Sequence, residues 1–351
     1  MKKITKKSIL CIIAAVLIIV SCFAACGDGD SKPEMEDLTN ISGKTFAMVG
    51  KDVSNPYMQK MYEGFRDACN EIGVKAIYRG PDLATPEKQI EIINQLTAQN
   101  VAVIAIAAND SDALQPALKN AIDKGIKVIS VDSAVNPQSR LVHIQQVDPE
   151  GLGREVMSAA HEMIGGNGGI AILSATAQAT NQNLWISWMK KELEENPEKY
   201  KNTPLIKVAY GDDDPTKSTS ETNALLTNPD VKIIIAPTTV GMLAAGKVLQ
   251  DKGSDVKLTG LGLPSEMAQY IESGVCPWMY LWNPTEIGYV AAYTGRALVT
   301  EEISGKDGDD FEAGKFGTKK VTTASDGGTE VVFGKPFKFD KENIGEWKDV
   351  Y

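Results

Sequence analysis

Residues 101–133 have the sequence VAVIAIAANDSDALQPALKNAIDKGIKVISVDS. Val101–Ala107 is an almost unbroken apolar run, Asp112–Lys124 has helical spacing and ends before Gly125, and Ile126–Val131 is a second apolar run. A short continuous apolar run predicts a strand that is buried on both faces. Two such strands joined by a helix predict a parallel βαβ unit, which requires helices on both sides of the sheet.

The same alternation occurs on both sides of this stretch. Toward the N-terminus, Thr45–Gly50 and Val74–Tyr78 are predicted strands, each followed by a helical pattern. The alternation begins again with a helix at Gly151–Ile164 and continues to a long helix at Pro284–Ile303. The part of the chain that shows this alternation, from about residue 41 to the C-terminus, has about 310 residues. This length is too great for a single small core and suits two domains. The predicted fold class is therefore α/β, with two doubly wound, Rossmann-like lobes.

The N-terminus has the features of an export signal. MKKITKK precedes Ile9–Ala25, which carries no charge, and the segment ends in Phe-Ala-Ala-Cys. This pattern is typical of a signal peptide (1–25), and the small residues before Cys26 resemble a lipoprotein cleavage site. We expect a lipid on Cys26, a flexible tether over 26–40, and a protein held at the extracytoplasmic face of the membrane. The alternative is an uncleaved membrane anchor.

Composition excludes several classes of protein. The formal net charge is −10, and removal of the four lysines of the signal peptide makes it more negative, so no nucleic acid is expected. The two histidines lack metal-ligand spacing, and no glycine-rich phosphate loop or GxSxG follows a strand. We therefore predict no cofactor, no metal, no catalytic residue and no enzyme activity. Cys69 and Cys276 are expected to be buried thiols.

The strand-to-helix junctions carry a different chemistry. They hold one Lys, several Asp, amides, hydroxyls, a Tyr and a Trp. Carboxylates and amides bind adjacent hydroxyl groups, and aromatic faces pack on sugar rings. Because ligands of such sheets bind at the carboxyl ends of the strands, these side chains predict a sugar site in a cleft between the lobes.

Several longer motifs support this interpretation. Among them are GPDLATPEKQIEIINQLTAQ (80–99), SATAQATNQNLWISWMK (174–190), APTTVGMLAAGKVL (236–249) and LWNPTEIGYVAAY (281–293). With these motifs the chain resembles the periplasmic-binding-protein type I superfamily, the ribose-binding-protein-like receptors of ABC importers. It is most similar to the branch that contains rhamnose-binding proteins and autoinducer-2 receptors.

The resemblance implies a hinge of three crossovers, near 145, 283 and 310. The N-terminal lobe would comprise 41–146 and about 284–310, and the C-terminal lobe 147–283 and about 311–351. It also implies that closure of the hinge clamps a ligand between the lobes.

The resemblance also assigns binding residues. Autoinducer-2 receptors have an Asp and an Ala where this chain has Asn181 and Thr239, and these departures favour a rhamnose-like sugar. Val131 stands where the rhamnose-binding pattern has a Trp. The resemblance implies ligand contacts at Lys51, Asp132, Asn181, Gln182, Pro237 and Thr239. Tyr57 and Trp282 are further candidates, because their rings could pack on a sugar ring.

The resemblance implies a function as well. We expect a monomeric, lipid-anchored substrate-binding protein that delivers a neutral sugar to an ABC permease and ATPase. A receptor of the same fold that senses autoinducer-2 or a sugar is the alternative.

Overall fold

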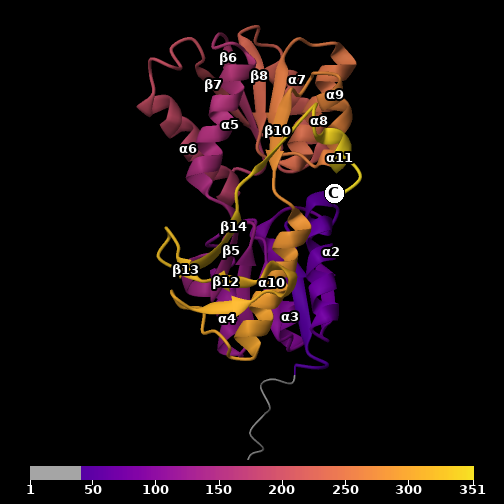
Figure 1. The fold of residues 1–351 in the computed structure, drawn as a ribbon, viewed down its shortest axis with the longest axis vertical. Helices are drawn as coiled ribbons and strands as arrows, with labels where there is room; N and C mark the ends of the chain where they lie inside the picture. The colour runs from indigo at the N-terminus through magenta and orange to yellow at the C-terminus, as the bar shows by residue number, and fades with distance from the viewer. Residues whose placement is uncertain (1–40) are drawn as a thin grey trace, which may run out of the picture. The chain divides into compact units, whose positions relative to one another are not determined.

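The computed structural model of the protein describes residues 41–351 (Figure 1). The predicted signal peptide (1–25), the predicted tether (26–40) and Cys26 lie outside these residues. Within the described range, no helix is both long and apolar enough to cross a membrane.

The first sheet has seven strands in the order β13-β14-β5-β4-β3-β1-β2. Its strands are parallel except for β13, which pairs antiparallel with β14. Their bounds are β1 Thr45–Val49, β2 Lys75–Arg79, β3 Val103–Ile106, β4 Lys127–Val131, β5 Val142–Val147, β13 Thr322–Thr323 and β14 Thr329–Gly334.

Helices cover both faces of this sheet, as the apolar strands predict. In β1, Phe46 and Met48 enter one buried cluster, whereas Ala47 and Val49 enter another, because alternate side chains point to opposite faces. Helices α2 (Pro56–Glu71) and α10 (Pro284–Val299) supply the first cluster, and α3 (Pro86–Ala98) and α4 (Gln115–Asp123) supply the second.

The second sheet has four parallel strands in the order β7-β6-β8-β9. Beside β9, a single bridge between Leu261 and Tyr280 brings in β10, which pairs antiparallel with β15. The strands are β6 Gly169–Ser174, β7 Leu205–Tyr210, β8 Val231–Ala236, β9 Lys257–Gly260, β10 Trp278–Leu281 and β15 Phe337–Asp340. The helices of this lobe are α5 Pro149–Met163, α6 Thr180–Glu195, α7 Pro215–Leu225, α8 Thr239–Lys252, α9 Pro264–Glu272 and α11 Ile344–Trp347.

Residues 101–133 form the predicted βαβ unit. Ile104 pairs with Val128 and Ala105 with Ile129 in parallel register. The helix starts at Gln115 rather than at Asp112, because the Asp110 carboxylate accepts the N–H groups of the next residues and holds them in a turn. The doubly wound α/β fold is confirmed.

The chain passes between the two sheets three times, and the third passage differs from our expectation. The first lies between β5 and α5, and the second between β10 and α10. We expected 311–351 in the C-terminal lobe. Instead, β14 pairs with β5 and extends the first sheet, and the chain crosses back only between β14 and β15 (Figure 1). The two short strands β11 (Asp310–Glu312) and β12 (Thr318–Lys320) precede it.

Cys69 and Cys276 are buried free thiols, as expected. Burial raises the pKa of Cys69 to about 12, so the thiol stays protonated at neutral pH.

The closest helix packing of the first lobe is between α2 and α10, which lie side by side in Figure 1. Gly64 faces the backbone of Thr285, and Gly288 faces the backbone of Met61. A Cβ at either glycine would overlap a carbonyl oxygen of the other helix. The two glycines therefore set the distance between these helices, which begin at the two junctions carrying Tyr57 and Trp282.

We expect Gly288→Ala to force α2 and α10 apart and to lower the free energy of unfolding by about 1–3 kcal/mol. Thermal unfolding measures this change. Gly345→Ala in α11 is the matched control, because its Cβ would meet no atom within 4 Å. Equal unfolding midpoints for the two variants would contradict the packing argument.

Candidate functional site

A pocket lies where the carboxyl ends of strands from the two sheets face each other. Five lining residues come from the first lobe, nine from the second, and one, Trp282, from the second crossover. All eight residues predicted from the sequence line it. The full set is Lys51, Asn55, Tyr57, Met58, Asp132, Asn181, Gln182, Trp185, Asp213, Pro237, Thr238, Thr239, Leu261, Leu281 and Trp282.

A buried ion pair lies in the wall of the pocket that the first lobe forms. Lys51 Nζ is 3.7 Å from Asp132 Oδ2, and both side chains are about 95% buried. Asn109 Nδ2 donates to the Lys51 carbonyl oxygen (2.9 Å), which anchors the loop after β1. Asp132 has a φ of +64°, a left-handed conformation that costs most residues free energy. This backbone directs the carboxylate from the end of β4 into the pocket.

Each oxygen of the Asp132 carboxylate has two donors nearby. Oδ1 accepts from Tyr57 OH (3.0 Å) and from Gln146 Nε2 (2.6 Å). Oδ2 accepts from Asn181 Nδ2 (3.2 Å) and faces Lys51. Such complete hydrogen bonding is what allows a carboxylate to remain charged inside a protein.

The first turn of α6 brings the second lobe to this ion pair. Lys51 Nζ donates to Asn181 Oδ1 (2.9 Å) and to Gln182 Oε1 (3.4 Å). Gln182 Nε2 donates in turn to the Pro237 carbonyl oxygen (3.3 Å) at the end of β8. Thr239, the first residue of α8, lies beside it in the wall. The two lobes are therefore joined by neutral amides that act as donors and acceptors at once.

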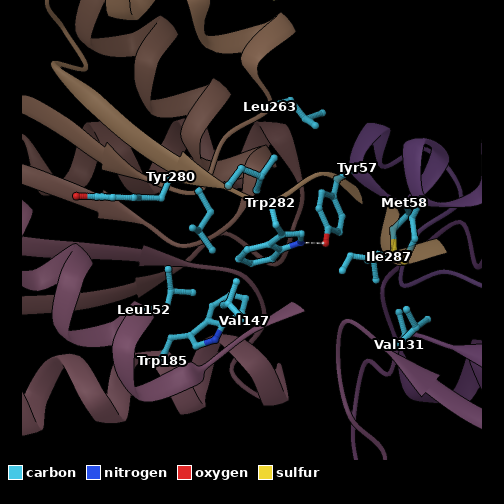
Figure 2. Close-up of a cluster of buried hydrophobic side chains, with 14 of the residues drawn as sticks. Tyr57, Met58, Val131, Val147, Leu152, Trp185, Leu263, Tyr280, Trp282 and Ile287 are labelled. Atoms are coloured by element: carbon cyan, nitrogen blue, oxygen red, sulfur yellow. Dashed lines mark hydrogen bonds between the residues drawn. The ribbon is translucent and has the colours of Figure 1, made fainter. Parts of the chain in front are cut away.

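Aromatic rings close another side of the pocket. Trp282 Nε1 donates to Tyr57 OH (2.6 Å), the contact drawn as a dashed line in Figure 2. The ring of Trp185 is 5.8 Å from that of Trp282, centroid to centroid. Trp185 is only 2% exposed, and its indole N–H has no acceptor among the described residues. Trp185 both packs in the core and lines the pocket.

Four polar residues in or near the pocket were not among the predicted contacts: Asp213, Thr238, Gln146 and Asn55. Asp213, in the loop between β7 and α7, accepts a hydrogen bond from Thr238 Oγ1 (2.5 Å). Burial raises the pKa of Asp213, and the positive charge of Lys51 opposes this rise. Gln146 is fully buried and orients Asp132, although it does not line the pocket. Asn55 also escaped prediction, and its side chain caps α2 by accepting from Tyr57 N (3.0 Å).

A hydrogen-bonded chain continues from Gln146 into the sheet. Gln145 Nε2 donates to Gln146 Oε1 (3.1 Å), and His143 Nε2 contacts Gln145 Oε1 (2.8 Å). Burial, reinforced by Arg140, lowers the pKa of His143 to about 4, so the imidazole is neutral at pH 7.

No histidine, cysteine or serine is among the described lining residues. The described lining residues offer hydroxyl, amide, carboxyl and ammonium groups as hydrogen-bond donors and acceptors.

Solved structures and curated proteins resemble this chain. An ABC transporter solute-binding protein from Clostridium phytofermentas, solved with bound L-rhamnose, is 46% identical, with a TM-score of 0.85 over 88% of this chain and 99% of that one. LsrB from Clostridium saccharobutylicum, solved in complex with AI-2, is 23% identical, with a TM-score of 0.80 over 86% and 99% of the two chains. The D-allose-binding periplasmic protein of Escherichia coli (strain K12) is 23% identical and matches 74% of this chain and 85% of its own.

A family model gives the broader classification. The model described as a periplasmic binding protein domain matches residues 46–303, which is most of the chain. This family consists of binding proteins rather than enzymes, which agrees with the chemistry of the pocket. The chain therefore belongs to the periplasmic binding protein family.

Proposed function

We propose that the protein is the extracytoplasmic substrate-binding component of an ABC sugar importer and that it binds L-rhamnose between its lobes. One observation carries the proposal: a balanced Lys51–Asp132 pair, the amides of Asn181 and Gln182, and the indole of Trp282 all meet in a single buried pocket. This set offers both donors and acceptors to a neutral polyol, and an aromatic face to its ring.

The relative solved with L-rhamnose supports the choice of sugar, because it shares 46% of its residues with this chain. The relative solved with AI-2 shares 23%, which is similarity of fold alone. Asn181 and Thr239 provide a further reason, since both differ from the pattern expected of autoinducer-2 receptors.

The size of the pocket indicates how a sugar would enter. Its volume is about 40 Å³, room for roughly three water molecules and too little for a sugar. The side chains around it bond to one another across the cleft, as Lys51 does to Asn181. Opening at the three crossovers would separate these groups, and closure would replace their mutual bonds by bonds to sugar hydroxyls.

Attachment to the membrane is part of the same proposal. A lipid on Cys26 and the tether over 26–40 would hold a monomer beside the permease and ATPase that accept the sugar. Both features lie outside the described residues, and metabolic labelling with a radioactive fatty acid tests them. We expect label in the wild type and none in Cys26→Ala.

Isothermal titration of the purified protein tests the ligand. We expect L-rhamnose to bind, other methylpentoses and ribose to bind more weakly, and autoinducer-2 not to bind. Binding of autoinducer-2 alone would establish the alternative receptor function. Absence of binding by every sugar would overturn the proposal.

Trp282→Phe should weaken sugar binding by about tenfold, or about 1.4 kcal/mol, because it removes the N–H bonded to Tyr57 and part of the aromatic face. Trp188→Phe in α6 is the control, since Trp188 lies outside the pocket, with Arg154 over its ring. Equal affinities in both variants would contradict the role of Trp282.

Asn181→Asp should weaken binding of the neutral sugar by at least about tenfold. The new carboxylate loses the amide donor to Asp132 and repels it. Asn183→Asp, in the same turn of α6 but outside the pocket, makes the same change in net charge. If both variants bind as tightly as the wild type, the amide of Asn181 does not bridge the lobes in the bound state.

A further inference from the structure

Asp212, Asp213 and Asp214 follow β7 and have three separate roles. Asp214 caps α7 by accepting from Lys217 N (2.6 Å). Asp212 is exposed and pairs with the Lys217 ammonium group. Asp213 lines the pocket. The middle carboxylate is the one that neither caps the helix nor forms a surface ion pair.

The backbone of this loop is held in an unusual conformation. Asp212 and Asp213 have φ values of +55° and +53°, which cost roughly 1–3 kcal/mol each for residues other than glycine. Asp212 N donates to the Ala175 carbonyl oxygen (3.2 Å), and Asp214 N donates to that of Gly211 (2.9 Å). The first bond ties the loop to the junction after β6, the second closes the loop on itself, and the Asp213 side chain lines the pocket.

The two pocket carboxylates differ in their remaining capacity to accept hydrogen bonds. A carboxylate has about four acceptor positions, and Asp132 has four neighbouring donors: Tyr57, Gln146, Asn181 and Lys51. Asp213 accepts only from Thr238 among the described residues. A polyol entering the pocket brings additional hydroxyl donors, and Asp213 has the free positions to receive them.

The charges of the lining residues also point to Asp213. The residues that α6 contributes to the pocket, Asn181, Gln182 and Trp185, are all neutral. Of the described residues that line the pocket, Asp213 is the only carboxylate from the second lobe. Lys51, extending from the first lobe, is the positive charge that acts on it.

We propose that Asp213 binds a hydroxyl group of the sugar from the second lobe and thereby selects among sugars. This inference rests on the proposed function, because it takes the ligand to be a sugar. A carboxyl acceptor beside the ligand favours sugars with a hydroxyl at that position and disfavours those with hydrogen or a methyl group there.

Titration of the wild type, Asp213→Asn and Asp212→Asn with L-rhamnose tests the proposal. Asparagine tolerates positive φ, so the loop conformation is retained in both variants. We expect Asp213→Asn to weaken binding about 10- to 100-fold, as for loss of a charged hydrogen bond. Asp212→Asn, next in the same turn but outside the pocket, should bind within about twofold of the wild type.

Monodeoxy sugars distinguish direct contact from a structural role. The analogue that lacks the hydroxyl bound by Asp213 should bind with equal affinity to the wild type and to Asp213→Asn. Each of the other analogues should still bind more weakly to Asp213→Asn than to the wild type. Wild-type affinity in Asp213→Asn for every sugar overturns the inference alone. A uniform loss for all analogues also overturns it, since it indicates a structural effect. If the wild type binds no sugar, the proposed function and this inference both fail.

Discussion

The ion pair between Lys51 and Asp132 is the constraint on which the site depends. Both side chains are about 95% buried. Removing their charges from water costs several kcal/mol unless neighbouring groups form hydrogen bonds with them. Here the satisfying groups come from both lobes: Tyr57 and Gln146 from the first, and Asn181 from the second. The pair is therefore fully compensated only when the lobes meet. This need for hydrogen-bond partners links sugar binding to lobe closure. In the bound state, sugar hydroxyls can form the hydrogen bonds that the two lobes otherwise form with each other.

Much of this arrangement could be predicted from the sequence. Continuous apolar strands such as Val103–Ile106 occur in parallel sheets, and parallel sheets gather the carboxyl ends of their strands at one edge. Lys51 and Asp132 come directly after β1 and β4 of one sheet, so their proximity follows from sheet topology, whereas Asn181 stands in the first turn of α6 in the other lobe and meets them only when the lobes face each other. Their prediction as ligand contacts needed the family resemblance as well, because a polar residue after a strand is also a common helix cap, as Asn55 is here.

The features that were missed depend on contacts distant in sequence. Strand β14 joins the first sheet through β5, nearly two hundred residues away, and its own pattern cannot indicate which sheet it extends. Gln146 looks like an ordinary strand residue until the sheet places it against Asp132. Asp213 stands between Asp212, which pairs with a lysine on the surface, and Asp214, which caps a helix, and the sequence does not show which of the three enters the pocket. Strained or buried polar positions of this kind are where local sequence patterns are least informative.

A crystal structure of the protein with L-rhamnose would test the central claim most directly. The account predicts a closed cleft in which sugar hydroxyls lie within hydrogen-bonding distance of Lys51, Asp132, Asn181 and Gln182, with the ring packed against Trp282. The direct bond between Lys51 and Asn181 should then be replaced by bonds to the sugar. A sugar bound elsewhere, or a pocket in which these side chains remain bonded only to one another, would contradict it.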